Sequence, residues 1–159
     1  MRMREFLHEA KRELEGVFHT VFVSLKYTRT VDVIRIAIDE IISLFDYLID
    51  VVLVYCIEEK KIEAMPTSVK AKMNMLKKIY PDDEKLAYYL DFYIFLRDLF
   101  KAPFDKREEY RRHVTMIANL SNRTVEVHID NLEDHFHRIA KDFFEYIKFL
   151  VGEEEEEIY

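Results

Sequence analysis

The sequence predicts an all-α fold, organised as one compact domain of about six helices. A chain of 159 residues has room for one hydrophobic core but not for two. Its residues are 50% hydrophobic, so a core can form, and 2 glycines and 3 prolines are too few to turn many short strands. Sandwiches, barrels and glycine-rich phosphate loops are therefore not expected.

The first two helices are predicted from apolar spacing. The first runs from about Arg4 to Tyr27, with a soft break near Gly16. Thr30 can cap the second, which continues to about Glu59 with apolar residues three and four positions apart. This second helix has more apolar surface than a small domain covers easily, and we therefore expect it to form the two-fold interface of a homodimer.

Capping residues and prolines bound the other four predicted helices, at about 66–80, 82–101, 105–120 and, after a break at 121–124, up to 150. Asp105 is a candidate N-cap with Glu108 completing a capping box, and Gly152 is a candidate C-cap. Residues 1–152 are thus expected to form one helical domain, and residues 153–159 an acidic tail.

Composition narrows the setting in which the protein works. The net charge is −7, and five consecutive glutamates at 153–157 supply much of it, so the domain itself is near neutral and neither requires nor excludes a nucleic acid. The single cysteine, Cys56, excludes a disulfide framework. No uncharged stretch approaches the ~18 residues of a membrane span, so we expect a cytoplasmic protein with no membrane partner. Its Glu and Lys content is typical of thermophiles.

The second helix carries an unusual polar stripe along an otherwise apolar surface, made up of Asp32, Arg35, Asp39, Ser43, Asp46 and Asp50. Asp46 and Asp50 are one turn apart, where like charges repel, and aspartate is a poor residue for a helix interior. Such a stripe can be the solvated face of an amphipathic helix. Converging carboxylates are also what a divalent cation requires, and the stripe therefore indicates a metal site.

Residues 44–53, LFDYLIDVVL, resemble the signature helix of the ribonuclease III catalytic domain, usually written R-L-E-F-L-G-D-A-V-L. Asp46 stands at the glutamate of that signature and Asp50 at its aspartate. Ile49 replaces a glycine, and Ser43 stands where the family has a further glutamate.

A second acidic pair extends the resemblance. Asp130 and Glu133 have the D-x-x-E spacing of the remaining metal ligands of that family. The resemblance implies that Asp46, Asp50, Asp130 and Glu133 bind Mg²⁺ or Mn²⁺, with Asp50 and Glu133 as catalytic residues. Asp39 would be an acid just outside the direct ligands of the ion.

The activity implied by this resemblance is metal-dependent hydrolysis of double-stranded or structured RNA. An ion lowers the pKa of a bound water, which attacks phosphorus and leaves 5′-phosphate and 3′-hydroxyl ends. The chain would correspond to short members of the family that consist of the catalytic domain alone, and the resemblance also implies a homodimer.

Two alternatives stay open. Arg123 and His128 fit the R-x(4)-H motif of the all-α, dimeric HEPN ribonucleases, which is expected to place both side chains one turn apart at a helix start for metal-independent cleavage. Arg107 and His113 fit the looser R-x(5)-H spacing. Because Ile49 and Ser43 depart from the ribonuclease III pattern, the third interpretation is an inactive helical dimer that acts as an RNA-binding accessory protein.

Overall fold

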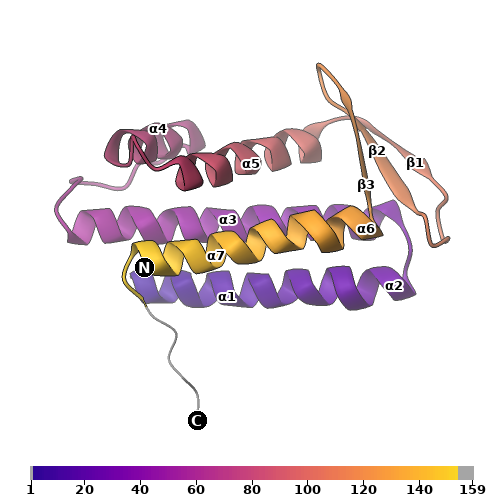
Figure 1. Ribbon diagram of the computed structural model, residues 1–159, viewed down its shortest axis with the longest axis horizontal. Helices are drawn as coiled ribbons and strands as arrows, with labels where there is room; N and C mark the ends of the chain where they lie inside the picture. Colours follow the sequence, from indigo (N-terminus) through magenta and orange to yellow (C-terminus); the bar gives the residue numbers. More distant parts are fainter. Residues whose placement is uncertain (1, 154–159) are drawn as a thin grey trace, which may run out of the picture.

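The computed structural model describes residues 2–153, and a long central helix, α3 (Val31–Glu58), forms its axis (Figure 1). Thr30 caps this helix as predicted, because its side-chain oxygen accepts a hydrogen bond from the backbone N–H of Val33 at 3.3 Å. Buried side chains occur along its whole length because α1, α4, α5, α7 and β2 all contact it.

The N-terminal segment is one continuous antiparallel helix beside α3. It consists of α1 (Met3–His19), a π-helical turn η1 (Thr20–Ser24) and α2 (Leu25–Tyr27). The predicted soft break at Gly16 is wrong, since α1 runs through that residue, and the irregularity lies at η1.

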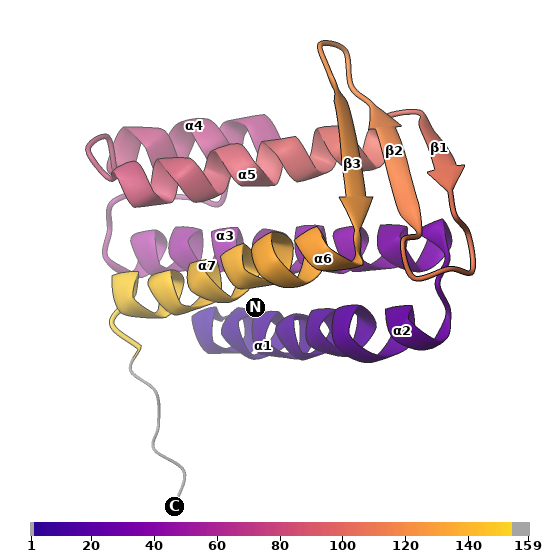
Figure 2. The ribbon, with the colours of Figure 1, turned by 45° about the vertical axis from the view of Figure 1, so that its right-hand side comes forward.

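The helices α4 (Val69–Ile79) and α5 (Glu84–Lys101) lie on one side of the layer formed by α3 and α7, and α1 lies on the other side (Figure 2). Both helices begin within a few residues of the predicted starts, and each is capped by a side chain. Ser68 accepts a hydrogen bond from the N–H of Ala71 at 3.0 Å, and Asp83 accepts one from the N–H of Leu86 at 2.9 Å. Asp83 also accepts a hydrogen bond from the Tyr146 hydroxyl, which joins the start of α5 to α7.

The helix predicted over 105–120 is wrong, and the all-α prediction holds only for the helical majority of the chain. Residues 104–128 form an antiparallel sheet of β1 (Phe104–Arg107), β2 (Thr115–Asn119) and β3 (Thr124–His128), in the order β1-β2-β3. Asp105 is no N-cap but a β1 residue opposite Ile117, and Glu108 has a left-handed φ of 54° instead of completing a capping box. Alternating residues explain β3, because Val125 and Val127 turn inward while Thr124 and Glu126 face water.

The last helix was predicted to begin directly after the break at 121–124. It begins at Ile129 instead, because residues 124–128 form β3. It comprises α6 (Ile129–Asn131), a second π-helical turn η2 (Leu132–Phe136) and α7 (His137–Leu150). Gly152 follows its end with a φ of 75°, as expected for a glycine after a helix. Of the predicted acidic tail, only Glu153 belongs to the described residues.

Within residues 2–153, no helix is both long enough and apolar enough to cross a membrane. The same part of the chain covers the apolar surface of α3 with its own elements. The homodimer stays a prediction, but this helix no longer requires a partner to bury it.

Candidate functional site

The acidic stripe on α3 is matched by polar groups of the elements that cover it. The hydroxyl of Tyr93 on α5 donates a hydrogen bond to Asp46, and Lys72 Nζ on α4 lies 2.7 Å from Asp50 Oδ1. Partial removal of water raises the pKa of Asp46, although the hydrogen bond from Tyr93 and the charge of Arg97 act in the opposite direction. Asp46 and Asp50 are therefore engaged with α4 and α5.

The second predicted pair, Asp130 and Glu133, lies at the other end of the helical layer. Both line a pocket beside α2, where Glu133 Oε1 is 3.1 Å from Lys26 Nζ. The pocket adjoins the start of α3 at Val31, and Asp46 is about 22 Å farther along that helix at 1.5 Å per residue. The structure does not bring the two predicted pairs together.

Residues 2–153 contain no group of three or more His, Cys, Asp or Glu side chains arranged to hold a metal ion. The predicted outer acid, Asp39, is exposed and lies outside the pocket. It lies near Glu13 and Glu40, whose pKa values are raised mainly by burial and further by its charge.

The pair Arg123 and His128 is also separated. Both were predicted at a helix start, but they lie at opposite ends of β3, about 17 Å apart for an extended strand. The guanidinium of Arg123 is 5.2 Å from the ring centroid of Phe95, and its backbone carbonyl accepts a hydrogen bond from Leu120 in the β2–β3 turn. His128, by contrast, lines the pocket together with the pair of the looser motif, Arg107 and His113.

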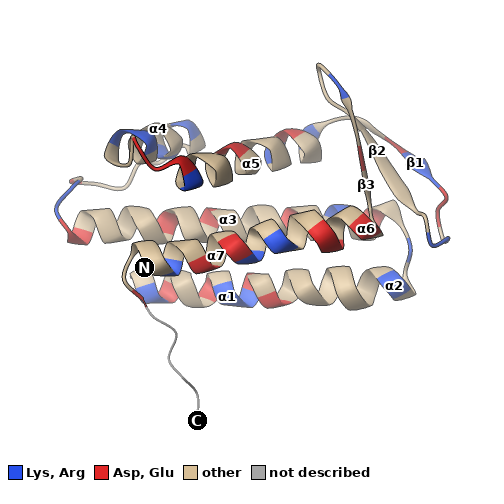
Figure 3. Cartoon of the chain, viewed as in Figure 1, with Lys and Arg blue, Asp and Glu red and all other residues tan. Residues whose placement is uncertain are grey.

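This pocket is the candidate functional site, and it has a volume of about 590 Å³. It is formed where α2, the hairpin and α6 meet, at an end of the molecule that carries both basic and acidic segments (Figure 3). Its lining side chains come from four segments, residues 26–29, 107–108, 112–115 and 126–133. They are Lys26, Arg29, Arg107, Glu108, Arg112, His113, Thr115, Glu126, His128, Ile129, Asp130 and Glu133.

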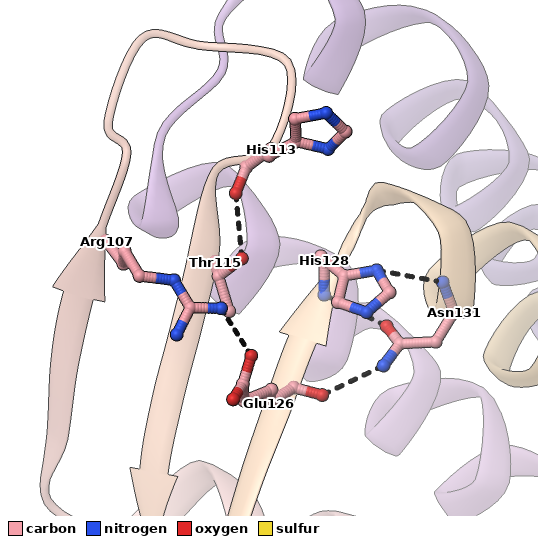
Figure 4. Close-up of polar contacts among 6 residues, drawn as sticks. All are labelled: Arg107, His113, Thr115, Glu126, His128 and Asn131. Atoms are coloured by element: carbon pink, nitrogen blue, oxygen red, sulfur yellow. Dashed lines mark hydrogen bonds and ion pairs between the residues drawn. The ribbon is translucent and has the colours of Figure 1, made fainter.

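The sheet places three of these residues in a row. Thr115 is paired with Arg107 of β1 on one side and with His128 of β3 on the other. Directly opposed residues point to the same face of an antiparallel sheet, so the three side chains share a face. His113 lies two residues before the start of β2, and Thr115 Oγ1 donates a hydrogen bond to its carbonyl at 2.8 Å (Figure 4).

His128 is held by the helix that follows it. Its Nδ1 accepts a hydrogen bond from the backbone N–H of Asn131 at 3.3 Å, and its own N–H donates to Asn131 Oδ1 at 2.9 Å, which is a capping box (Figure 4). A backbone N–H can only donate, so Nδ1 must be unprotonated and the ring proton is on Nε2. With Nδ1 engaged in this way, His128 can offer its Nε2–H to the pocket as a donor.

The loop that carries His113 is fastened to the start of α3. The N–H of Tyr110 donates to the carbonyl of Arg29 at 2.6 Å, and Glu109 Oε2 accepts a hydrogen bond from the N–H of Val31 at 3.0 Å. Glu108 and Tyr110 both have left-handed φ values, 54° and 68°. Such conformations cost on the order of 1 kcal/mol each for residues other than glycine, and they concentrate at functional sites.

The charges of the pocket are partly paired with one another. Glu126 accepts a hydrogen bond from Arg107, which lowers the pKa of Glu126, and Lys26 pairs with Glu133. Arg29 differs, because its Nε is buried and has no hydrogen-bond partner within residues 2–153. A buried donor without a partner costs about 1–3 kcal/mol, so this guanidinium indicates a site for an anionic group.

Sequence reasoning did not identify Lys26 or Arg29 as site residues, and it noted His113 only within the looser motif. Three signals in the sequence led to residues of this pocket: the spacing of Asp130 and Glu133, His128 of the R-x(4)-H motif, and the looser pair of Arg107 and His113. Comparisons with protein-family models, with curated proteins and with solved structures found no significant match to this chain.

Proposed function

We propose that this protein is a metal-independent ribonuclease that uses the 2′-hydroxyl of RNA as the nucleophile. One observation carries the proposal: His113, His128 and Arg29 come from three separate segments to line one cavity. Its volume of about 590 Å³ lies within the usual range for small-ligand sites and is large enough for a nucleotide phosphate.

The residues divide naturally between binding and proton transfer. Arg29 and Arg112 would bind the phosphate oxygens, because guanidinium groups make paired hydrogen bonds to phosphate. His128 would donate its Nε2–H to an oxygen on which negative charge develops during the reaction. His113, on an exposed loop, would take the proton of the 2′-hydroxyl as general base.

In this reaction a bond forms between the 2′-oxygen and phosphorus as the bond from phosphorus to the 5′-oxygen breaks. The proton of the 2′-hydroxyl moves to His113, and the departing 5′-oxygen takes a proton from a water in the open pocket, which in turn takes the proton held by His113. The products are a 2′,3′-cyclic phosphate and a 5′-hydroxyl. No step requires the four carboxylates, which the structure holds apart.

The test is cleavage of labelled RNA that has both paired and unpaired regions, in excess EDTA and in Mg²⁺. We expect cleavage in EDTA with 2′,3′-cyclic phosphate ends. His113→Ala should lower the rate by about 100-fold or more, as the loss of a general base does. His128→Asn should have a similar effect, because asparagine preserves the helix cap but cannot replace the Nε2–H donor.

The matched control is His135→Ala. His135 is an exposed histidine on η2 that contacts Arg138 and lies outside the pocket, so its loss should leave the rate unchanged. Cleavage that requires Mg²⁺, leaves 5′-phosphates and is lost in Asp50→Asn would contradict the proposal in favour of the ribonuclease III alternative. RNA binding without cleavage in either buffer would favour an accessory protein.

A further inference from the structure

An aromatic pair, the exposed Phe18 and the partly buried Phe22, lies on η1 and the end of α1, facing α7. The ring of Phe18 is stacked on that of Phe22 with 4.8 Å between the centroids, and Phe18 is 52% exposed. The ring of His137 meets the edge of Phe22 at 5.1 Å. Burial lowers the pKa of His137, with the charge of Lys141 acting in the same direction, which favours the neutral imidazole, and its ring extends the aromatic surface.

This aromatic pair is continuous with the pocket. Lys26 Nζ lies 5.9 Å from the ring centroid of Phe22 and 3.1 Å from Glu133 Oε1, which lines the pocket. The two π-helical turns η1 and η2 contact each other at this place and carry Phe22 and Glu133. Single π-helical turns within helices occur often at functional sites.

Two more rings lie in segments that line the pocket. Tyr27, 87% exposed, follows Lys26, and Tyr110, 78% exposed, lies on the loop between β1 and β2. The hydrogen bond from the Tyr110 N–H to the Arg29 carbonyl holds that part of the loop beside the pocket. Exposed aromatic rings alternating with basic side chains are the pattern by which proteins bind single-stranded nucleic acids.

We infer that Phe18 and Phe22 form a stacking subsite for an unpaired base, and that the substrate is therefore single-stranded RNA. The inference rests on the proposed function for the phosphate in the pocket. A base within a duplex is already stacked on both faces, whereas an unpaired base can place a face on an aromatic side chain. Lys26, between the rings and the pocket, can follow the phosphate backbone from one to the other.

The test measures binding rather than cleavage, so that its outcome does not depend on activity. A fluorescently labelled oligonucleotide with 2′-O-methyl riboses cannot be cleaved through the 2′-oxygen. Its affinity is measured by anisotropy as a single strand and as a blunt duplex of the same sequence. We expect the single strand to bind at least about 10-fold more tightly, and Phe18→Ala to weaken that binding by about 5- to 100-fold, the usual effect of losing one stacking ring.

Phe18→Trp should restore the affinity, because stacking needs an aromatic face and not phenylalanine itself. Tyr88→Ala is the matched control, since Tyr88 is an aromatic residue of α5 that is 50% exposed, far from the pocket residues in sequence and not among them. It should leave the affinity unchanged.

Equal affinity for strand and duplex would overturn the inference, and so would native affinity in Phe18→Ala. If Phe18→Ala changed only the sedimentation of the protein, from dimer to monomer, the aromatic pair would be a contact between two copies and the inference would be wrong. If His113→Ala loses cleavage but binds the single strand as tightly as the native protein, this inference stands. If the native protein binds the single strand tightly but cleaves no RNA, only the proposed ribonuclease activity is contradicted.

Discussion

Lys72 Nζ lies 2.7 Å from Oδ1 of Asp50, and this ion pair joins α4 to the middle of α3. Only 24% and 19% of the two side chains are exposed, so water weakens their attraction less than at the surface. Lys106 similarly lies 3.7 Å from Asp32 at the start of α3. Acidic residues in an otherwise apolar helix are thus explained in part by cations on the elements that cover it.

The first prediction concerns this ion pair. Asp50→Asn and Lys72→Met should each lower the free energy of unfolding by about 1–3 kcal/mol, because each leaves a partly buried charge without its partner. The double variant should lose less than the sum of the two. Urea unfolding measures the free energy of unfolding of the two single variants and the double variant. The control is Asp39→Asn, which is at an exposed position and should change stability by less than about 0.5 kcal/mol. Strictly additive losses would show that the pair contributes no interaction energy.

The second prediction follows from the raised pKa of Asp46, whose largest cause is loss of contact with water. The folded protein holds this proton more tightly than the unfolded chain does. The contribution of Asp46 to stability is therefore complete below its ordinary pKa of 3.8 and is lost as pH rises through the higher folded value. Relative to Asp46→Asn, which does not titrate, the native protein should lose stability as pH rises. Urea unfolding from about pH 3.5 to 7 measures the difference, and a constant difference would contradict the raised pKa.

Much of the helical framework is predictable from local signals. Thr30 caps its helix as expected, and Ser68 and Asp83 cap helices that begin close to the predicted starts, because short polar side chains satisfy N–H groups that no helical carbonyl can reach. The hairpin was missed although its signal is present. Residues 124–128, TVEVH, alternate with a period of two, and residues 121–123 before them suit a turn, but capping-type residues at 105 and 108 favoured a helix.

The site was less predictable than the fold because its parts come from distant segments. Asp46 and Asp50 stand out in the sequence by their spacing, yet the fold gives each a donor from another helix. Arg29 has no distinguishing neighbours in the sequence, and its unpartnered Nε is visible only after the hairpin loop covers the start of α3. Pairing between side chains far apart in sequence is a property of tertiary structure that local patterns do not encode.

The third prediction concerns the close approach of α1 and α3. A Cβ atom at Gly16 would lie 2.8 Å from Oε2 of Glu40, whose carboxylate accepts a hydrogen bond from Thr20. Gly16→Ala gains about 1 kcal/mol of helix propensity but displaces that carboxylate, a loss of about 1.5–3 kcal/mol. It should therefore destabilise the native protein by about 0.5–2 kcal/mol.

In a Glu40→Ala background, the effect of Gly16→Ala on the free energy of unfolding should have the opposite sign. With the carboxylate removed, only the propensity gain of about 1 kcal/mol remains, so Gly16→Ala should stabilise that variant. Thermal or urea unfolding of the native protein, Gly16→Ala, Glu40→Ala and the double variant measures this double-mutant cycle. An equal effect of Gly16→Ala in both backgrounds would show that Glu40 does not restrict this position.

The last prediction tests the anion site through Arg29 with inorganic phosphate as the probe. A ligand that binds only the folded state raises the free energy of unfolding by about 2.7 kcal/mol when its concentration is 100 times its Kd. Phosphate should therefore raise the unfolding temperature of the native protein in a saturable manner. Arg29→Met should abolish the saturable part and retain only the general salt effect that phosphate has on any protein. Without phosphate, Arg29→Met should be at least as stable as the native protein, because the substitution removes a buried donor that has no partner. A large loss of stability in phosphate-free buffer would instead show that Arg29 serves the fold, and an unchanged response to phosphate would place the anion elsewhere.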